Sequence, residues 1–263
     1  MTLPRIELAY TDVGSGPALI FLHGYPFDRS MWREQIELPS AKGFRAVGPD
    51  LRGLGESKGS GEITTMEEMA RDVGALLNKL KIDRAVICGL SMGGYVAFEF
   101  VHLFPTRVLG LVLAGTRAPA DNDQEKQGRE QQAQRMLAEG MSGIADATLP
   151  KLLAPRTLSD KPEVVARVRE MILRSDPRGA AAAQRGMAMR RDYADDLPNI
   201  SVPTLIVVGR EDPIRPVADA EFMQRLIRNS RLGIIEDAAH MTNMEQPEIF
   251  NERLSVFLEQ LTQ

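Results

Sequence analysis

The sequence predicts an α/β protein with a doubly wound, mostly parallel sheet and a helical segment inserted between two of its strands. Short runs of branched apolar residues alternate with longer helical patterns, which is typical of parallel strands covered by helices on both faces. One interval, residues 117–196, contains helical patterns but no strand-like run. With 263 residues, the chain is long enough to bury a large core without disulfides.

The elements are expected in the following order. Residues 6–10 and the turn at residues 12–17 indicate an antiparallel hairpin at one edge of the sheet. The remaining strands are expected at residues 18–22, 44–48, 85–89, 108–114, 204–208 and 232–235. Helices are expected at residues 28–38, 64–80, 93–104, 216–228 and 247–261, several of which begin with Asp, Thr or Pro.

The helical insertion divides the predicted core into residues 1–116 and 197–263. Within residues 117–196, an apolar helix face is formed by Val164, Val168, Met171 and Ile172. The insertion carries 11 Arg and 3 Lys against 13 acidic side chains, so it is close to neutral. Amphipathic helices with a solvated outer face explain these charges better than an anion-binding surface does.

Composition favours a small molecule as the partner. The net charge is only −4 and basic residues form no long run, which argues against nucleic acid or an anionic membrane. The single cysteine, Cys88, cannot form an internal disulfide and is expected to pack in the core. The first ten residues lack the pattern of a signal peptide, and no apolar stretch is long enough to span a bilayer, so we expect a cytoplasmic protein.

A candidate nucleophile lies in one of two Gly-x-Ser-x-Gly motifs. The motif at residues 55–59, around Ser57, has a loop-like neighbourhood. The motif Gly89-Leu90-Ser91-Met92-Gly93 follows a predicted strand and precedes a predicted helix. That setting is the one in which a serine hydroxyl is exposed above the sheet on a sharp turn, so we predict Ser91 as the nucleophile. The alternative is that Ser91 only caps the helix between packing glycines.

A serine nucleophile needs a base that works near neutral pH, which favours histidine. The chain has three: His23, His102 and His240. His102 is carried away from Ser91 by the predicted helix, and His23 follows a strand in a tight turn where a structural role is expected. His240 lies just past the last predicted strand, where ligands gather in open α/β sheets. We therefore predict His240 as the base.

The carboxylate that orients His240 is expected at another strand end, and Asp212 occupies such a position after the strand at residues 204–208. Glu211 is the adjacent competitor. Asp50 is better explained as a residue that hydrogen-bonds the local backbone of its loop. The oxyanion donors should be the backbone N–H of Met92, directly after the serine, and that of Tyr25, in the loop after the strand expected at residues 18–22.

Together these residues resemble the α/β-hydrolase superfamily along essentially the whole chain. The matching segments are residues 23–26, 49–57, 89–94, 209–212 and 238–240. Within that superfamily, residues 93–98 and 245–248 are similar to bacterial carboxylesterases and 3-oxoadipate enol-lactonases. The resemblance implies that Ser91, Asp212 and His240 form a triad and that residues 117–196 form a lid. Haloalkane dehalogenases and epoxide hydrolases carry an aspartate where this chain has Ser91, so those chemistries are not expected.

The expected activity is hydrolysis of small carboxylic esters through an acyl-enzyme. The pocket is expected to be shaped by the lid and by apolar or aromatic side chains: Tyr25, Phe27, Met136, Met187 and Met189. Alternatives are an enol-lactonase with a cationic pocket supplied by lid arginines, a non-catalytic small-molecule binding protein, and an esterase acting on an acyl carrier protein. No metal or nucleotide motif is present in the sequence, so no cofactor is expected.

Overall fold

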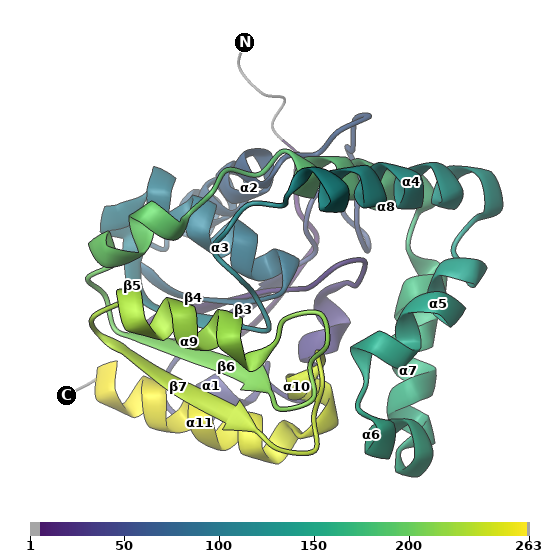
Figure 1. Cartoon of the computed structure of the whole chain (residues 1–263). Coiled ribbons are helices and arrows are strands. Elements are labelled where there is room, and N and C mark those ends of the chain that lie inside the picture. The colour runs from purple at the N-terminus through teal and green to yellow at the C-terminus, as the bar shows by residue number, and fades with distance from the viewer. Residues whose placement is uncertain (1–5, 262–263) are drawn as a thin grey trace.

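A central seven-stranded sheet organises residues 6–261, which are the residues described by the computed structural model (Figure 1). The strand order is β1-β3-β2-β4-β5-β6-β7; β1 is antiparallel to β3, and all other neighbouring strands are parallel. The strands are β1 (Tyr10–Gly14), β2 (Ala18–Leu22), β3 (Arg45–Pro49), β4 (Ala85–Leu90), β5 (Val108–Ala114), β6 (Thr204–Gly209) and β7 (Ser230–Ile235). The predicted doubly wound, mostly parallel sheet is therefore confirmed.

The amino-terminal edge differs from the predicted hairpin. Strand β1 begins at Tyr10 rather than at residue 6, and it pairs with β3, Tyr10 lying opposite Pro49. Strand β2 is buried at every position, so it lies inside the sheet between β3 and β4. Strand β1 is partly exposed along its length, which suits the edge. The turn between β1 and β2 therefore does not join two neighbouring strands, because β3 lies between them in the sheet.

Helices cover both faces of the sheet. One face carries α2 (Met66–Lys79), α3 (Met92–Leu103) and α9 (Val217–Leu226), and the other carries α1 (Leu38–Ala41), α10 (Thr242–Glu245) and α11 (Pro247–Leu261) (Figure 1). Instead of one helix at residues 28–38, the chain forms a short 3₁₀ helix, Arg29–Trp32, and then α1. Pro39 has no N–H to donate, so it fits the first turn of α1, where no helical partner is needed.

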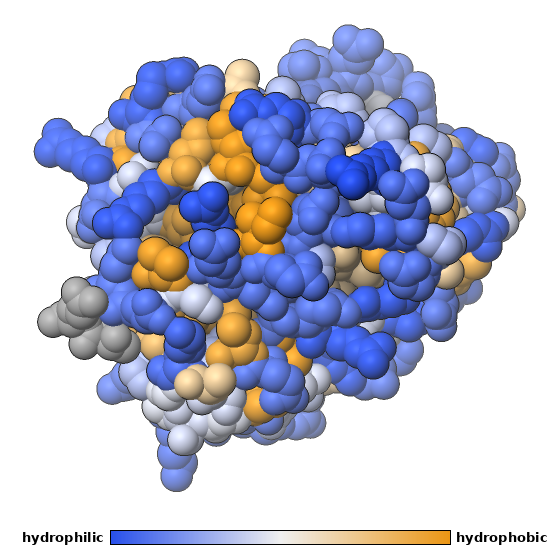
Figure 2. Space-filling view, turned by 90° about the horizontal axis from the view of Figure 1, so that it is seen from below, coloured by the Kyte–Doolittle hydropathy of each residue, from blue (hydrophilic) through white to orange (hydrophobic). Residues whose placement is uncertain are grey.

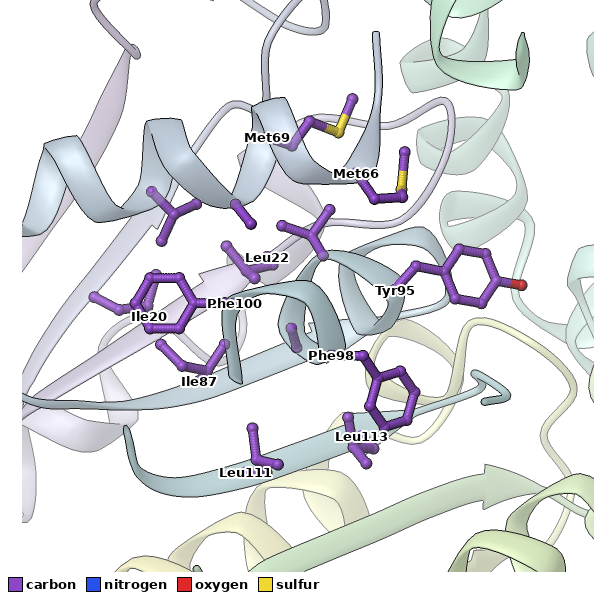
Figure 3. Close-up of a cluster of buried hydrophobic side chains, with 14 of the residues drawn as sticks. Ile20, Leu22, Met66, Met69, Ile87, Tyr95, Phe98, Phe100, Leu111 and Leu113 are labelled. Carbon is purple, nitrogen blue, oxygen red and sulfur yellow. The ribbon is translucent and has the colours of Figure 1, made fainter. Parts of the chain in front are cut away.

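Alternation along the buried strands builds two apolar layers. In β2, Ile20 and Leu22 pack on the side of α2 and α3, and Phe21 packs on the side of α11. Figure 3 shows the first layer, where Met69 of α2 lies above Ile20 and Leu22 of the sheet and Phe100 of α3 belongs to the same cluster. In the second layer the Trp32 ring lies 5.0 Å from the Phe21 ring and 5.9 Å from the Phe250 ring, measured between centroids. These layers fix the ends of the strands, from which the site is built.

Five α-helices form the insertion between β5 and β6. They are α4 (Asp123–Glu139), α5 (Ser142–Leu152), α6 (Pro155–Asp160), α7 (Pro162–Arg174) and α8 (Pro177–Ala188), followed by the 3₁₀ helix Ala194–Asn199. Helix α4 packs against α8, and α5 packs against α7, at one side of the sheet (Figure 1). Helix α8 meets the core so closely that a Cβ on Gly179 would lie 1.7 Å from the carbonyl oxygen of Gly53.

The surface is mostly hydrophilic on the face seen in Figure 2, where apolar residues gather in limited patches. Large exposed apolar side chains are few and come from separate elements: Ile63, Leu137, Leu158, Leu173, Met189 and Val256. Cys88 is buried in β4, and this burial raises the pKa of its thiol. No helix within residues 6–261 combines the length and the apolar character needed to cross a bilayer.

Replacing Trp32 with alanine should lower the free energy of unfolding by about 3–5 kcal/mol, because it opens a cavity between Phe21 and Phe250. Val256→Ala on α11, whose side chain is 48% exposed, is the control and should change stability by less than about 0.5 kcal/mol. Urea unfolding followed by circular dichroism measures both. Equal effects of the two substitutions would contradict this account of the second layer.

Candidate active site

Ser91 sits on a strained turn between β4 and α3. Its φ of 54° and ψ of −111° lie outside the ordinary regions for a residue with a side chain. Its N–H donates to the carbonyl of Ala114 at 2.8 Å, which ties the turn to β5. The flanking glycines leave no room for a side chain: a Cβ on Gly89 would lie 2.2 Å from the Gly93 oxygen, and one on Gly93 would lie 2.1 Å from the Leu22 oxygen. Close backbone packing thus holds Ser91 at the strand end.

His240 and Asp212 form a buried pair. His240 Nδ1 lies 2.7 Å from Asp212 Oδ2, and the two residues are 3% and 4% exposed. The second carboxylate oxygen of Asp212 accepts the backbone N–H groups of Ile214 at 2.8 Å and Arg215 at 2.9 Å. Because an ionised carboxylate can only accept, Nδ1 carries the ring proton and Nε2 keeps its lone pair. The arrangement leaves Nε2 as the ring nitrogen that is not bound to Asp212.

Ser91 and His240 line one pocket of about 240 Å³, below the usual range of about 300–1,000 Å³ for small-molecule sites. The core contributes Tyr25, Pro26, Ser91, Tyr95, Ile214, Arg215 and His240 to its lining. The insertion contributes Arg129, Gln132, Ile144, Thr148, Lys151, Leu152, Gln184 and Met187. The pocket therefore lies where the strand ends meet the helical insertion, and its size suits a small ligand.

The two predicted oxyanion donors lie at the ends of β2 and β4. Met92 is the first residue of α3, so its N–H has no partner inside the helix, and Tyr25 lies in the turn after β2. Within residues 6–261, no hydrogen bond uses the backbone N–H of either residue. The Tyr25 hydroxyl donates to Met136 Sδ at 3.0 Å, and burial raises the pKa of this phenol.

Of the five side chains expected in the pocket, Tyr25 and Met187 line it. Phe27 and Met136 are fully buried in the apolar layer behind Tyr25. Met189 is 64% exposed at the end of α8 and borders a different surface hollow with Ile63 and Arg185. The expectation for Phe27, Met136 and Met189 rested on residue type, whereas the direction of each side chain depends on how the insertion packs.

The second Gly-x-Ser-x-Gly serine braces a loop. Ser57 is buried, its hydroxyl donates to the carbonyl of Asp50 at 2.7 Å, and it accepts the N–H of Ala9 at 2.9 Å. The Asp50 carboxylate accepts the N–H of Arg29 at 2.7 Å and that of Glu56 at 2.8 Å. Both residues therefore brace the loop, which was expected for Asp50.

The other two histidines are also accounted for. His23 Nε2 accepts the N–H of Leu51 at 2.8 Å, and Nδ1 lies 2.9 Å from the carbonyl oxygen of Gly24. Burial lowers the pKa of His23, which favours the neutral ring that this bonding requires. His102 is exposed on α3, with Nδ1 3.9 Å from Asp196. Glu211, the competitor of Asp212, also has an exposed side chain.

Glu245 is a site residue whose role the sequence did not reveal. Its carboxylate is fully buried and accepts the N–H of Ala239 at 2.8 Å and that of Ala154 at 2.6 Å. Ala239 precedes His240, whereas Ala154 belongs to the insertion, and His240 N–H also donates to the Leu152 carbonyl at 3.1 Å. Burial raises the pKa of Glu245, and these N–H donors partly oppose that effect. Glu245 thus fastens the insertion to the loop that carries His240.

A buried ion cluster lies on the insertion side of the pocket. The Asp121 carboxylate is bound by the guanidinium groups of Arg117, Arg129 and Arg190, the first at 2.8 Å. Burial opposes ionisation of Asp121, but its bonds to Arg129 and Arg190 outweigh burial and hold its pKa far below the usual range. The cluster therefore stabilises the fold above about pH 3.9, the unfolded value, and loses this contribution as the pH falls toward the folded pKa.

No group of three or more His, Cys, Asp and Glu side chains within residues 6–261 is arranged to hold a metal ion.

Comparison with known proteins gives consistent matches along the chain. The profile of the family described as alpha/beta hydrolase fold matches residues 17–247. 3-Oxoadipate enol-lactonase 2 of Acinetobacter baylyi is 32% identical over 260 residues, which is 98% of this chain and 95% of that protein.

Solved structures agree closely with this one. A thermophilic esterase from Thermogutta terrifontis, determined with malate bound, superposes with a TM-score of 0.95 and 43% identity, covering 97% of this chain and 94% of its own. The enol-lactonase from Burkholderia xenovorans superposes with a TM-score of 0.90 and 29% identity, covering 97% of each chain.

Glu245→Ala should lower the free energy of unfolding by about 2–5 kcal/mol, because it leaves two buried backbone N–H groups without acceptors. Glu248→Ala, three residues later and exposed, removes the same charge and is the matched control, with a change of less than about 0.5 kcal/mol. Chemical denaturation of both variants measures the difference. If Glu245→Ala were as stable as the control, Glu245 would not join the insertion to the His240 loop.

Proposed function

Because this chain belongs to the α/β-hydrolase fold family, we propose that it hydrolyses carboxylic esters of small acids with Ser91 as nucleophile, His240 as general base and Asp212 as its orienting carboxylate. One observation carries the proposal: the Asp212–His240 pair, 2.7 Å apart, lies at the same pocket as the strained Ser91 turn. A serine, a neutral imidazole and a buried carboxylate are the three groups that acyl transfer through serine requires.

In the first half of the reaction, Ser91 Oγ attacks the ester carbonyl carbon while His240 Nε2 takes the hydroxyl proton. The carbonyl oxygen becomes an oxyanion, which accepts hydrogen bonds from the N–H groups of Met92 and Tyr25. Collapse of this intermediate breaks the bond to the alcohol oxygen, and His240 returns its proton to the departing alcohol. The acyl group is then esterified to Ser91. Asp212 holds the ring in place and stabilises the imidazolium formed on the way.

In the second half, a water molecule takes the place of the alcohol. His240 removes one proton from the water as its oxygen attacks the acyl carbon, and the same two N–H groups bind the new oxyanion. The intermediate releases Ser91, which recovers its proton from His240, and the carboxylic acid leaves. The protein ends in its starting state, so the residues of this chain suffice for a full turnover.

We propose that the helical insertion serves as a lid over this chemistry. More than half of the residues lining the pocket come from it, including Leu152, Met187 and Arg129. Its hydrogen bonds to the His240 loop, through Glu245 and Leu152, connect the cover of the pocket to the base. A lid in this position limits the space for the acyl group and reduces the access of bulk water.

A lactone is the second candidate substrate, because a lactone is an ester closed into a ring and needs the same steps. The names of two similar proteins favour it: an enol-lactonase of Acinetobacter baylyi and one of Burkholderia xenovorans. With a lactone, the alcohol released in the first half stays attached to the acyl chain. The two candidates differ only in whether the leaving alcohol can diffuse away.

Ser91→Ala should lose about 10⁴-fold or more of the kcat of wild type on p-nitrophenyl esters of graded acyl length, because no other group can form the acyl-enzyme. An enol-lactone assayed in parallel separates the two candidates, since turnover of the lactone alone would favour the second. Reaction with a fluorophosphonate probe, read by mass spectrometry, should label wild type at Ser91 and leave the variant unlabelled.

Ser57→Ala is the matched control, since it removes the serine of the other Gly-x-Ser-x-Gly motif. It should keep activity within about threefold of wild type once folding is verified by circular dichroism, because a bracing hydroxyl lies outside the reaction. Retention of activity in Ser91→Ala, or loss of probe labelling in Ser57→Ala, would show that the nucleophile has been misassigned.

Asp212→Asn should lower kcat on the same esters by about 10⁴-fold with little change in KM, because an amide at this position favours the wrong tautomer of His240. Steady-state kinetics at several pH values measure the effect. Glu211→Gln removes the neighbouring exposed charge and should leave both parameters unchanged. Equal losses in the two variants would contradict Asp212 as the orienting group.

A further inference from the structure

The charged groups lining the pocket are all cationic. Within residues 6–261, the lining includes Arg129, Lys151 and Arg215 but no Asp or Glu side chain. Positive charges around a pocket of about 240 Å³ favour an anion between them, to the extent that acidic side chains do not already neutralise them. The chemistry proposed for Ser91 needs none of these side chains. They are therefore better explained as groups that bind another part of the ligand, away from the bond that is broken.

Arg215 is the best placed of the three. Its backbone N–H binds Asp212, so its position is tied to the His240 pair. Its side chain donates from Nε and Nη2 to the Tyr95 hydroxyl, at 3.2 and 2.5 Å, and from Nη1 to the Ile214 carbonyl at 2.6 Å. An arginine has five N–H donors, so one on each terminal nitrogen stays available. No carboxylate within residues 6–261 forms an ion pair with Arg215.

Tyr95 lies near the positive charges of three arginines, Arg215, Arg190 and Arg129. Figure 3 shows its ring at the end of the apolar layer, with the hydroxyl pointing away from the other labelled side chains. The Arg190 guanidinium lies 4.2 Å from the ring centroid. Burial favours the neutral phenol, but the charges of Arg215, Arg190 and Arg129 outweigh burial and lower the pKa of Tyr95. A position where a buried phenol is pushed toward its anion is also favourable for a carboxylate.

The other cations differ in how far they are already neutralised. Arg129 and Arg190 share the Asp121 carboxylate, so most of the insertion-side charge is compensated. Asp219 is influenced by Arg215: burial raises its pKa, and the charges of Arg215 and Arg117 offset only part of that rise. Lys151 is exposed at the pocket and has no ion-pair partner within residues 6–261. The pocket cations that lack a direct ion pair within residues 6–261 are therefore Arg215 and, at the rim, Lys151.

We propose that this pocket takes esters or lactones that carry a carboxylate, which Arg215 binds through its two available N–H groups while Lys151 attracts it at the rim. The proposal deepens the proposed function and rests on it for the bond that is hydrolysed. The Tyr95 hydroxyl, which already accepts from Arg215, keeps its own hydrogen to donate to a carboxylate oxygen. The subsite belongs mainly to the core, on Arg215 and Tyr95, rather than to the paired arginines of the insertion.

The kinetic test compares charged and neutral esters of matched size. One pair carries the charge on the acyl group: p-nitrophenyl hydrogen adipate and p-nitrophenyl hexanoate. The other carries it on the alcohol: 4-butanoyloxybenzoate and phenyl butanoate. Wild type should prefer the charged member of at least one pair by about tenfold or more in kcat/KM. Arg215→Met should remove that preference, and Arg215→Lys should restore part of it.

Lys151→Met should lower the preference by about threefold and weaken its dependence on salt, because an exposed charge acts mainly by attraction at a distance. Arg135→Met is the matched control: Arg135 is exposed on α4, pairs with Glu139 at 2.8 Å and does not line the pocket. It should leave the preference unchanged. Neutral esters turned over as well as charged ones in both pairs would overturn the carboxylate subsite while leaving ester hydrolysis intact.

A binding measurement makes the subsite testable without turnover. Isothermal titration of Ser91→Ala with glutarate and with glutaramide should show binding of the diacid and about tenfold weaker binding of the diamide. Adding Arg215→Met to Ser91→Ala should abolish the difference. Equal affinity for the two compounds would overturn the subsite, whereas selective binding of glutarate by a protein that hydrolyses no ester would overturn only the proposed function.

Discussion

The backbone packing at Ser91 is the constraint on which the rest of the site depends. Gly89, Gly93 and the Leu22 carbonyl approach so closely that a single added carbon at either glycine would overlap backbone atoms. This approach forces the chain from β4 into α3 within one residue, so Ser91 adopts a φ that side chains rarely allow. The cost, of order 1–3 kcal/mol, is offset by the buried strands on each side, β2 and β5. The same turn leaves the first N–H of α3, that of Met92, without a helical partner.

The His240 ring is held by polar contacts rather than by close packing of carbon atoms. Asp212 uses one carboxylate oxygen for two backbone N–H groups and the other for His240, so the positions of the carboxylate and of the ring are fixed together. The Glu245 carboxylate likewise accepts two backbone N–H groups, and so it joins Ala239, the residue before His240, to Ala154 of the insertion. Two buried carboxylates thus connect three stretches of chain that lie far apart in the sequence. The insertion and the loop that carries His240 are therefore parts of one hydrogen-bonded unit.

Charge is distributed unevenly around this unit. Most arginines of the insertion are satisfied by Asp121, Glu125, Glu130 and other acids, which agrees with the near neutrality of residues 117–196. The exceptions that face the pocket are Lys151 and, from the core, Arg215. Arg215 is half-buried against the Tyr95 hydroxyl, so a bound anion would supply the opposite charge that it lacks in a direct ion pair. The proposed carboxylate subsite therefore follows from which charges are left unpaired, and the total number of arginines has little influence on it.

The sequence by itself determined the alternation of strands and helices and the place of Ser91, because glycines at 89 and 93 between an apolar strand and a helix permit little else. It also put Asp212 and His240 at strand ends, where a parallel sheet brings side chains together. Tertiary structure decided the rest. Strand β1 pairs with β3 because the fully buried β2 takes the interior position. Both features depend on strands that are far apart in the sequence. Phe27, Met136 and Met189 were chosen by residue type, but whether a side chain faces a cavity depends on the angle at which the insertion docks. The role of Glu245 depends on its contact with Ala154, which is far away in the sequence. The role of Arg215 depends on its contact with Tyr95 and on the lack of a direct carboxylate partner. No spacing in the sequence encodes these contacts.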